Sequence, residues 1–328
     1  MKHSTSRQAS MRHVAAYTQA LALAVLAAAA LGGCAKKSPE GGAASGAAKP
    51  GTAARRVGVT LLTMQHGFYQ ELRAGLEAAA RDRGYQLVVT TGEFDAARQA
   101  NQIDEFIVQK LDAIVVCPCD SRSVGASIAQ ANAAGIPVFT ADIASTSPLG
   151  TVVAHVASDN QAGGRKAAEL LLAALGGAGT VAVLSHPEVT SVADRVAGFK
   201  AGIAAQPAVR IVAELSAEGK RDRAVKVMED VLQAHPDLDG VFAINDDSAL
   251  GALAAIEAAG KLGRIHIVGY DATPEARAKI DAGALYADVV QDPRQIGRLT
   301  LEAIDDYFHG RAPAPFIPVP VGAYGHGG

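Results

Sequence analysis

The chain has 328 residues, of which 49% are hydrophobic, so it can bury the cores of two ordinary domains. Its 30 basic and 33 acidic residues are mixed along the sequence and give a formal net charge of -3. Because no strongly basic segment stands out, this composition argues against a nucleic-acid partner.

Residues 1–33 have the pattern of a secretory signal peptide. Lys2, Arg7 and Arg12 form a basic region without acids. A run of about 13 apolar or small residues follows and is too short to span a bilayer. The run ends in "LGGC", which resembles a bacterial lipobox, in which the cysteine becomes the first mature residue and carries lipid. We predict lipidation of Cys34, with a plain secreted protein as the alternative.

Residues 34–54 are mostly small and polar and show no apolar period, so we predict a flexible tether between the lipid and the folded domain. The anchor predicts a location in the periplasm if the cell has two membranes, or on the outer surface if it has one. Ala35 and Lys36, directly after the cysteine, do not decide which membrane holds the anchor.

From Arg56 onward, short apolar runs alternate with segments of helical period. The runs expected as strands are residues 56–62, 85–90, 111–118, 136–142, 150–158, 179–185, 209–215, 240–246, 265–271 and 285–292. Continuous apolar strands between amphipathic helices imply parallel sheets that are covered on both faces. The alternation of strands and helices starts again after Asp159, and ten strands are more than one doubly wound sheet usually contains. We therefore predict two similar, doubly wound α/β lobes.

Cys117 and Cys119 lie at the end of a predicted strand. A Cys-x-Cys pair makes a strained disulfide, and no second cluster of cysteine and histidine completes a four-ligand metal site. We expect both thiols to pack in the structure, with a redox-labile pair as the alternative. We expect no metal and no cofactor.

Ligands of open parallel sheets collect beyond the carboxyl ends of the strands. The residues at these ends include rings, carboxylates and amides: His66, Gly67, Phe68, Tyr69, residues 117–120, Asp142, residues 185–195, Asn245, Asp246, Asp247, Tyr270, Asp271 and Gln291. Carboxylates and amides hydrogen-bond to hydroxyls, arginine supplies a rigid fork, and rings stack on the apolar face of a sugar. The combination favours a neutral polyhydroxylated ligand.

Each of these residues also has a structural alternative. Phe68 and Tyr69 could be core residues of the first helix, and His66 could be a solvated loop histidine. The carboxylates and Asn245 could cap helices, and for Asp247 capping is the preferred interpretation.

Several stretches then occur in an order that is typical of one family. They are "HGFYQELRAG", "IPVFTAD", "VVAHVASDNQAGG", "RVAGF", "AHPDLDGVFAINDDSALGALAAI", "IVGYDATPEA" and "VVQDPRQIG". Over residues 56–322 the chain resembles the periplasmic sugar-binding proteins of the ribose-binding, type I class. The resemblance implies that Phe68 and Tyr69 stack on a sugar. It also implies that hydroxyls are bound by Asp142, Arg195, Asn245, Asp271 with Tyr270, and Gln291.

Three positions depart from the pattern of the ribose binders. Ile143 stands where they usually carry arginine, His66 where asparagine is expected, and Gly219, beside Lys220, where an aromatic residue is expected. A pocket that pairs hydroxyls rejects ligands that leave its groups unmatched, so these changes can redirect specificity. The class of ligand is therefore predicted, with His66 tuning which ring is accepted, but the particular sugar is not.

The resemblance further implies three crossings between the lobes, near Ser158, near Asp292 and at residues 318–322. It predicts an N-terminal lobe of residues 55–157 and 292–320 and a C-terminal lobe of residues 158–291 and 321–328. The lobes would close on the ligand, and an ABC permease in the inner membrane would recognise the closed, monomeric protein. The alternatives are a chemoreceptor or sensor kinase as partner, or an amino acid, nucleoside or signal molecule as ligand.

An enzyme or a repressor fits the sequence less well. No nucleophile-elbow motif or P-loop is present, and "GGAG" at 176–179 lacks the third glycine of a dinucleotide fingerprint and precedes a strand. Asp142 and Asp271 could form an acid and base pair for glycoside chemistry, but each fits hydroxyl binding more simply. A repressor core would carry a helix-turn-helix where this chain has a signal peptide. We therefore predict a binding protein and not an enzyme.

Overall fold

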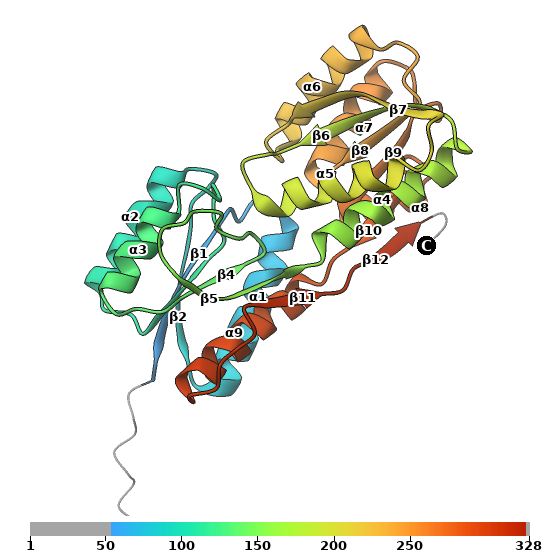
Figure 1. The fold of residues 1–328 in the computed structure, drawn as a ribbon. Coiled ribbons are helices and arrows are strands. Elements are labelled where there is room, and N and C mark those ends of the chain that lie inside the picture. Colours follow the sequence, from blue (N-terminus) through green and yellow to red (C-terminus); the bar gives the residue numbers. More distant parts are fainter. Residues whose placement is uncertain (1–53, 326–328) are drawn as a thin grey trace, which may run out of the picture. The chain divides into compact units, whose positions relative to one another are not determined.

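The computed structural model describes residues 54–325 as two α/β lobes (Figure 1). This arrangement confirms the predicted fold class. The predicted signal peptide, Cys34 and the tether up to residue 53 lie outside the described residues. Within the described range, no helix has both the length and the apolar character needed to cross a membrane.

The first lobe contains a sheet with the strand order β11-β5-β4-β3-β1-β2, in which all neighbours run parallel. Its strands are β1 Arg56–Leu61, β2 Gln86–Thr91, β3 Ala113–Val116, β4 Val138–Ala141, β5 Val152–Ser158 and β11 Phe316–Val319. Helices α1 Gly67–Arg83 and α9 Pro293–Phe308 pack together on one face, and α2 Ala96–Val108 and α3 Gly125–Ala133 cover the other (Figure 1). Because both faces are covered, a central strand such as β3 is buried throughout.

The second lobe repeats this plan with the strand order β12-β10-β9-β8-β6-β7. Its strands are β6 Gly179–Ser185, β7 Val209–Ser216, β8 Gly240–Ala243, β9 His266–Asp271, β10 Ala287–Val290 and β12 Gly322–Gly325. Its helices are α4 Asn160–Leu175, α5 Thr190–Ile203, α6 Arg221–Ala234, α7 Asp246–Ala258 and α8 Pro274–Asp281. Helices α4 and α5 lie on one face, and α6, α7 and α8 lie on the other.

Both sheets have a topological switch point. In the first sheet β1 lies between β2 and β3, and in the second β6 lies between β7 and β8. The loops that leave the strands on either side of such a point turn to opposite faces, which opens a crevice at the carboxyl ends of the strands. The chain passes from one sheet to the other after β5, after β10 and between β11 and β12.

The last two strands are not visible in the sequence rhythm. Segments β11 and β12 are only four residues long each, and one contains Pro318 while the other begins and ends with glycine. Both are edge strands, where a proline is tolerated because its missing N–H faces away from the ladder. Strand β12 runs antiparallel to β10, so the second sheet is not wholly parallel.

Cys117 and Cys119 are buried free thiols behind the end of β3, as the packing interpretation expects. Burial raises the pKa of Cys119 to about 12, so this thiol stays protonated at neutral pH. The amide of Gln99 joins the two positions, because Nε2 donates to the Cys117 carbonyl at 2.9 Å and Oε1 accepts from the Cys119 N–H at 2.8 Å.

Candidate ligand-binding site

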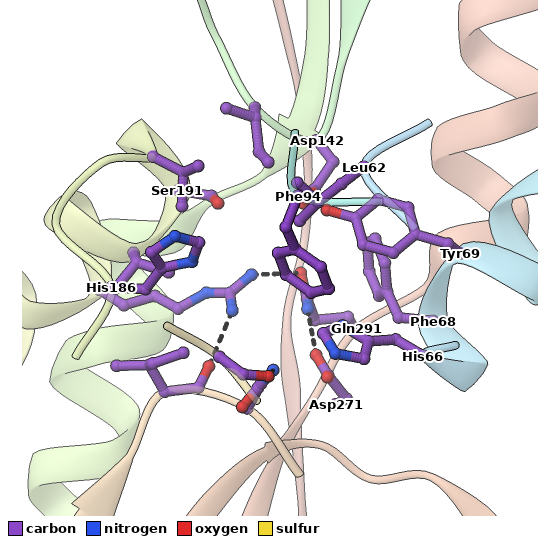
Figure 2. Close-up of a pocket in the computed structure, with 17 residues that line it drawn as sticks. Leu62, His66, Phe68, Tyr69, Phe94, Asp142, His186, Ser191, Asp271 and Gln291 are labelled. Carbon is purple, nitrogen blue, oxygen red and sulfur yellow. Dashed lines mark hydrogen bonds between the residues drawn. The ribbon is translucent and has the colours of Figure 1, made fainter. Parts of the chain in front are cut away.

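A cavity of about 40 Å³ lies where the carboxyl ends of the two sheets face each other (Figure 2). It is lined by Leu62, His66, Phe68, Tyr69, Phe94, Asp142, Ile143, His186, Val189, Ser191, Val192, Arg195, Gly219, Ile244, Asn245, Asp271 and Gln291. These residues come from the strand ends and the loops that follow them, from the first turn of α1 and from the first two turns of α5. The cavity therefore occupies the crevice that the strand order creates.

Arg195, on α5, is the centre of a polar network in the second lobe. Its Nε donates to Asn160 Oδ1 at 2.8 Å, one terminal nitrogen donates to the Ile244 carbonyl at 2.8 Å, and the other donates to Gln291 Oε1 at 3.2 Å. Gln291 Nε2 in turn donates to Asp271 Oδ1 at 2.6 Å (Figure 2). Three of the five N–H donors of the guanidinium are thus held by the protein, which fixes its plane.

Tyr270 is the one predicted binding residue that does not line the cavity. Its ring is fully buried and lies under the Arg195 guanidinium, whose carbon is 4.0 Å from the ring centroid. A side chain at position 163 would collide with the ring, because a Cβ there would lie 1.9 Å from the Tyr270 hydroxyl. Gly163 therefore makes the room in which Tyr270 supports the arginine from behind.

In the first lobe, a tyrosine and an aspartate form the polar part of the cavity wall. Tyr69 Oη donates to Asp142 Oδ2 at 2.7 Å, and the Phe68 ring stands nearly perpendicular to the Tyr69 ring at 5.1 Å between centroids. The other oxygen of Asp142 is buried and has no donor among the described residues. A buried acceptor without a donor is costly, so this oxygen is suited to accept a hydrogen bond from a ligand hydroxyl.

The two acids of the cavity carry raised pKa values. Burial raises the pKa of Asp142, and the opposing effects of Arg195 and Tyr69 are smaller. Burial and the nearby Asp246 raise the pKa of Asp271 well above its usual value, against Arg195 and Gln291. An anionic ligand would add charge next to two buried carboxyl groups, whereas a neutral ligand would not.

His66 is not a solvated loop histidine, because its side chain is only 12% exposed. Its Nε2 lies 3.5 Å from Asp247 Oδ2 in the other lobe. Burial lowers the pKa of His66, although Asp247 and Glu93 act in the opposite direction, so the ring is neutral at pH 7. The interpretation of Asp247 as the cap of α7 is wrong, because Asn245 caps this helix. Asp247 lies in the first turn and pairs with Arg221 as well as with His66.

Asn245 caps helix α7, which was its structural alternative, and also lines the cavity. Its Oδ1 accepts from the Ser248 N–H at 2.9 Å and so caps α7, while Nδ2 donates to the Gly219 carbonyl at 3.0 Å. Ile143 and Gly219, the two departures from the ribose-binder pattern besides His66, both line the cavity. Any change in ligand specificity that they cause would therefore come from their own contact with the ligand.

Several lining residues were not singled out from the sequence. Phe94 follows β2 and His186 follows β6, so the strand-end rule could have found both. His186, Val189, Ser191 and Val192 all lie within residues 185–195, to which the rule points, whereas Phe94 is missed. The aliphatic residues Leu62, Val189, Val192 and Ile244 look like ordinary core residues in the sequence.

The two lobes contact each other directly beside the cavity. Thr190 Oγ1 accepts from the Ala144 N–H at 2.8 Å, and the Thr190 N–H donates to Ser121 Oγ at 3.0 Å. The Ser121 N–H also donates to the Glu188 carbonyl at 3.1 Å. The structure is therefore a closed arrangement, held in part by hydrogen bonds between protein groups.

Comparison with known proteins agrees with this architecture. Residues 57–312 match the family model described as a periplasmic binding protein domain. The ribose import binding protein of Bacillus subtilis strain 168 is 36% identical over 266 residues, which cover 81% of this chain and 85% of that protein. Two solved structures are also similar.

The first is a myo-inositol binding protein of Caulobacter bound to myo-inositol, with 30% identity and a TM-score of 0.79 over 86% of this chain and 96% of that one. The second is a periplasmic solute binding protein of an ABC transporter from Actinobacillus succinogenes 130z with bound D-allose, with 27% identity and a TM-score of 0.77 over 83% and 97%. With its two lobes, its cavity at both switch points and this family match, the chain belongs to the periplasmic binding proteins.

Proposed function

We propose that the protein captures a small neutral polyhydroxylated ligand, a monosaccharide or a related polyol, and delivers it to an ABC permease. The observation that carries this proposal is the composition of the closed cavity. The cavity combines an Asp142 oxygen that has no donor among the described residues, the network of Arg195, Gln291 and Asp271, and the aromatic residues of the first lobe.

Each part of the cavity suits a sugar. A hydroxyl is both donor and acceptor, so one hydroxyl can donate to a carboxyl oxygen and accept from a guanidinium. Phe68 and Tyr69 offer aromatic surface for the apolar C–H face of a ring. Predicted ligand roles for His66, Asp142, Arg195, Asn245, Asp271 and Gln291 follow from their place in the lining, and Tyr270 acts through Arg195.

The relatives support this class of ligand. Proteins named for ribose and myo-inositol, and a solute binding protein with bound D-allose, are similar to this chain. An amino acid would place its carboxylate beside the buried carboxyl groups of Asp142 and Asp271, with only the two N–H groups of Arg195 that the protein does not hold to pair with it. We therefore favour a sugar over an amino acid.

We infer that the protein works outside the cytoplasm, attached to a membrane through lipid on Cys34. This inference depends on the signal pattern and the "LGGC" sequence. Expression of the full chain, followed by detergent phase partitioning, tests it. The protein should enter the detergent phase, and Cys34→Ser should move it to the aqueous phase; partitioning of both forms into water would contradict the anchor.

Thermal unfolding in the presence of candidate ligands tests the function. The panel is D-ribose, xylitol, D-allose, myo-inositol, nucleosides and amino acids. A ligand at about 100 times its dissociation constant should add about 2.7 kcal/mol to the free energy of unfolding, which raises the melting temperature by several degrees. We expect this shift with a sugar or polyol.

The matched variants are Asp271→Ala in the cavity and Asp237→Ala on the surface, where the side chain is 90% exposed. The shift should be lost in the first and kept in the second. A shift with nucleosides or amino acids alone would overturn the sugar proposal.

A further inference from the structure

Phe94 is a ring of the first lobe that contacts His66 of its own lobe, at 5.4 Å between ring centroids, and two residues of the second lobe. It belongs to the loop between β2 and α2 and lines the cavity. Its ring centroid is 6.3 Å from that of His186, and the Lys220 ammonium lies 4.6 Å from the Phe94 centroid. Both partners belong to the second lobe. In Figure 2 the ring is seen between His186 on one side and Tyr69 on the other.

The backbone that carries this ring is strained. Glu93 and Phe94 have φ values of 51° and 63°, so two successive residues with side chains occupy the left-handed region. This conformation is rare for a bulky residue and persists only where surrounding contacts enforce it, which happens most often at functional sites. The strained turn therefore indicates that the position of Phe94 matters to the protein.

The carboxylate of Glu93 enforces the turn. Its hydrogen bonds come from Thr63 Oγ1 at 2.7 Å, the Met64 N–H at 3.2 Å, Gln65 Nε2 at 3.1 Å and Thr91 Oγ1. The Phe94 N–H also donates to the Leu62 carbonyl at 3.2 Å. These bonds attach the loop after β2 to the loop after β1, so Phe94 is placed by the same segment that leads into Phe68 and Tyr69.

On the opposite side of the cavity, the loop after β7 contributes no side chain from position 219. Gly219 has a φ of 64°, and a Cβ there would lie 3.3 Å from Asn245 Nδ2, closer than an ordinary contact. The next residue, Lys220, places its ammonium over the Phe94 ring. Phe94 thus provides an aromatic ring beside the loop after β7, which contributes no ring to the cavity.

The cavity that these walls enclose is small. Its volume is about 40 Å³. A ligand must fit closely against every wall, and Phe94 forms the wall next to His186 and Lys220. Removal of its ring would enlarge the cavity on that side.

We propose that Phe94, held in a strained turn by Glu93, is a specificity-determining residue that completes the cavity on closure and favours five-carbon over six-carbon ligands. This inference rests on the proposed function, because it assumes a sugar or polyol in the cavity. Phe94 would contact the ligand, and Glu93 acts as a positioning residue.

Isothermal titration of the purified protein with D-ribose, xylitol, D-allose and myo-inositol tests the inference. The wild type should bind a five-carbon ligand more tightly than the six-carbon ones. Phe94→Ala should weaken five-carbon binding about tenfold or more and change six-carbon binding by less than about threefold, so that the ratio of dissociation constants shifts. Glu93→Ala should shift the ratio in the same direction by a smaller factor, because Phe94 itself remains.

Two controls separate specificity from folding. Tyr307→Ala removes a partly exposed ring on α9 and should leave the ratio unchanged. Phe94→Leu keeps an apolar side chain of intermediate reach, and it should shift the ratio partway even if Phe94→Ala does not fold. Melting temperatures without ligand identify the folded variants.

Equal weakening of all four ligands in Phe94→Ala or Phe94→Leu would overturn the inference, because the ring would then only assist closure. Unchanged affinities would overturn it as well, as would a wild type that prefers six-carbon ligands. A wild type that binds none of the four, but binds a nucleoside or an amino acid, would instead overturn the proposed function.

Discussion

The two lobes bring different chemistry to the cavity. The first contributes the rings of Phe68, Tyr69 and Phe94, whereas the second contributes the network around Arg195. The bonds from Arg195 to Gln291 and onward to Asp271 are internal to the second lobe, so they do not depend on closure. The contacts of Phe94 with His186 and Lys220 cross between the lobes and do depend on it.

This difference indicates an order of events. A preorganised polar surface on the second lobe can bind hydroxyls in the open state at little cost in side-chain ordering. The rings of the first lobe would then cover the ligand as the lobes close, and the hydrogen bonds of Thr190 with Ala144 and Ser121 add to the closed state. We expect changes in the network to affect binding more than changes in contacts between the lobes.

The largest effect is expected from Arg195→Ala. The change would leave Asn160, Gln291 and the Ile244 carbonyl without their buried donor, and Asp271 without a nearby cation. We expect a loss of about 3 kcal/mol in the free energy of unfolding and at least about a 100-fold loss of affinity. Urea unfolding measures the change in stability, and titration measures the change in affinity. Arg264→Ala, which removes an exposed arginine of the same lobe, should change neither; full affinity in Arg195→Ala would contradict the order of events.

The second lobe also contains a buried pair of carboxyl groups, Asp246 and Asp288. Asp246 Oδ1 and both Asp288 oxygens have no donor among the described residues, so a shared proton would provide one. Burial, with Asp271 nearby, raises the pKa of Asp288 to about 7, against the effects of Asp246, Gly269 and Arg277.

The folded state holds this proton more tightly than the unfolded state. The contribution of this carboxyl group to stability is therefore fully present below about pH 4 and is lost as the pH rises towards 7. We expect the free energy of unfolding to fall by on the order of 2 kcal/mol between pH 5 and pH 8. Asp288→Asn, which brings its own donor, should show a smaller fall in chemical denaturation. The same fall in both proteins would show that the pair is not responsible.

In the first lobe, Tyr69→Phe tests the pairing with Asp142. The change removes the hydroxyl that donates to Oδ2, so neither Asp142 oxygen would have a donor within residues 54–325. We expect binding to weaken by about 1 to 2 kcal/mol, roughly tenfold. Titration with the best ligand measures this. Tyr324→Phe removes a tyrosine hydroxyl that donates to Asp281 at the surface, and it is the matched control. An effect as large as that of Arg195→Ala would remove the distinction between the lobes.

The smallest effect is expected between the lobes, at His66 and Asp247. Because the His66 ring is neutral at pH 7 and Arg221 keeps Glu275 as an ion-pair partner, Asp247→Asn should weaken binding by no more than about 1 kcal/mol. Titrations at low and high salt would detect the change. Asp230→Asn, at an exposed position on α6, is the control. A larger loss would show that contacts between the lobes matter as much as the network.

The sequence predicts much of this arrangement because its signals are local. Apolar runs between amphipathic segments mark the strands up to β10, and a parallel α/β topology sends their carboxyl ends to one edge. His66, Asp142, Asn245 and Gln291 could be nominated for that reason alone. The short strands β11 and β12 have no such signal, since four residues with proline or glycine show no period.

The adjacent residues Tyr270 and Asp271 show where local signals end. Alternation along a strand requires that one of two neighbours turn away from the cavity, but it does not say which. The structure places Asp271 at the cavity and Tyr270 under Arg195, where the missing side chain of Gly163 leaves room.

By itself, the sequence determined the class of fold, the edge of the sheets where a ligand would lie, and most of the polar residues found there. Only the tertiary structure decided where Phe94 lies, at the cavity and against the other lobe. Its left-handed turn is held by hydrogen bonds that Thr63, Met64 and Gln65, which are distant in the chain, donate to the Glu93 carboxylate. Its ring contacts a lysine and a histidine from the other lobe. Strain and contacts of this kind depend on residues that only the folded chain brings together, so the periodicity of the sequence cannot predict them.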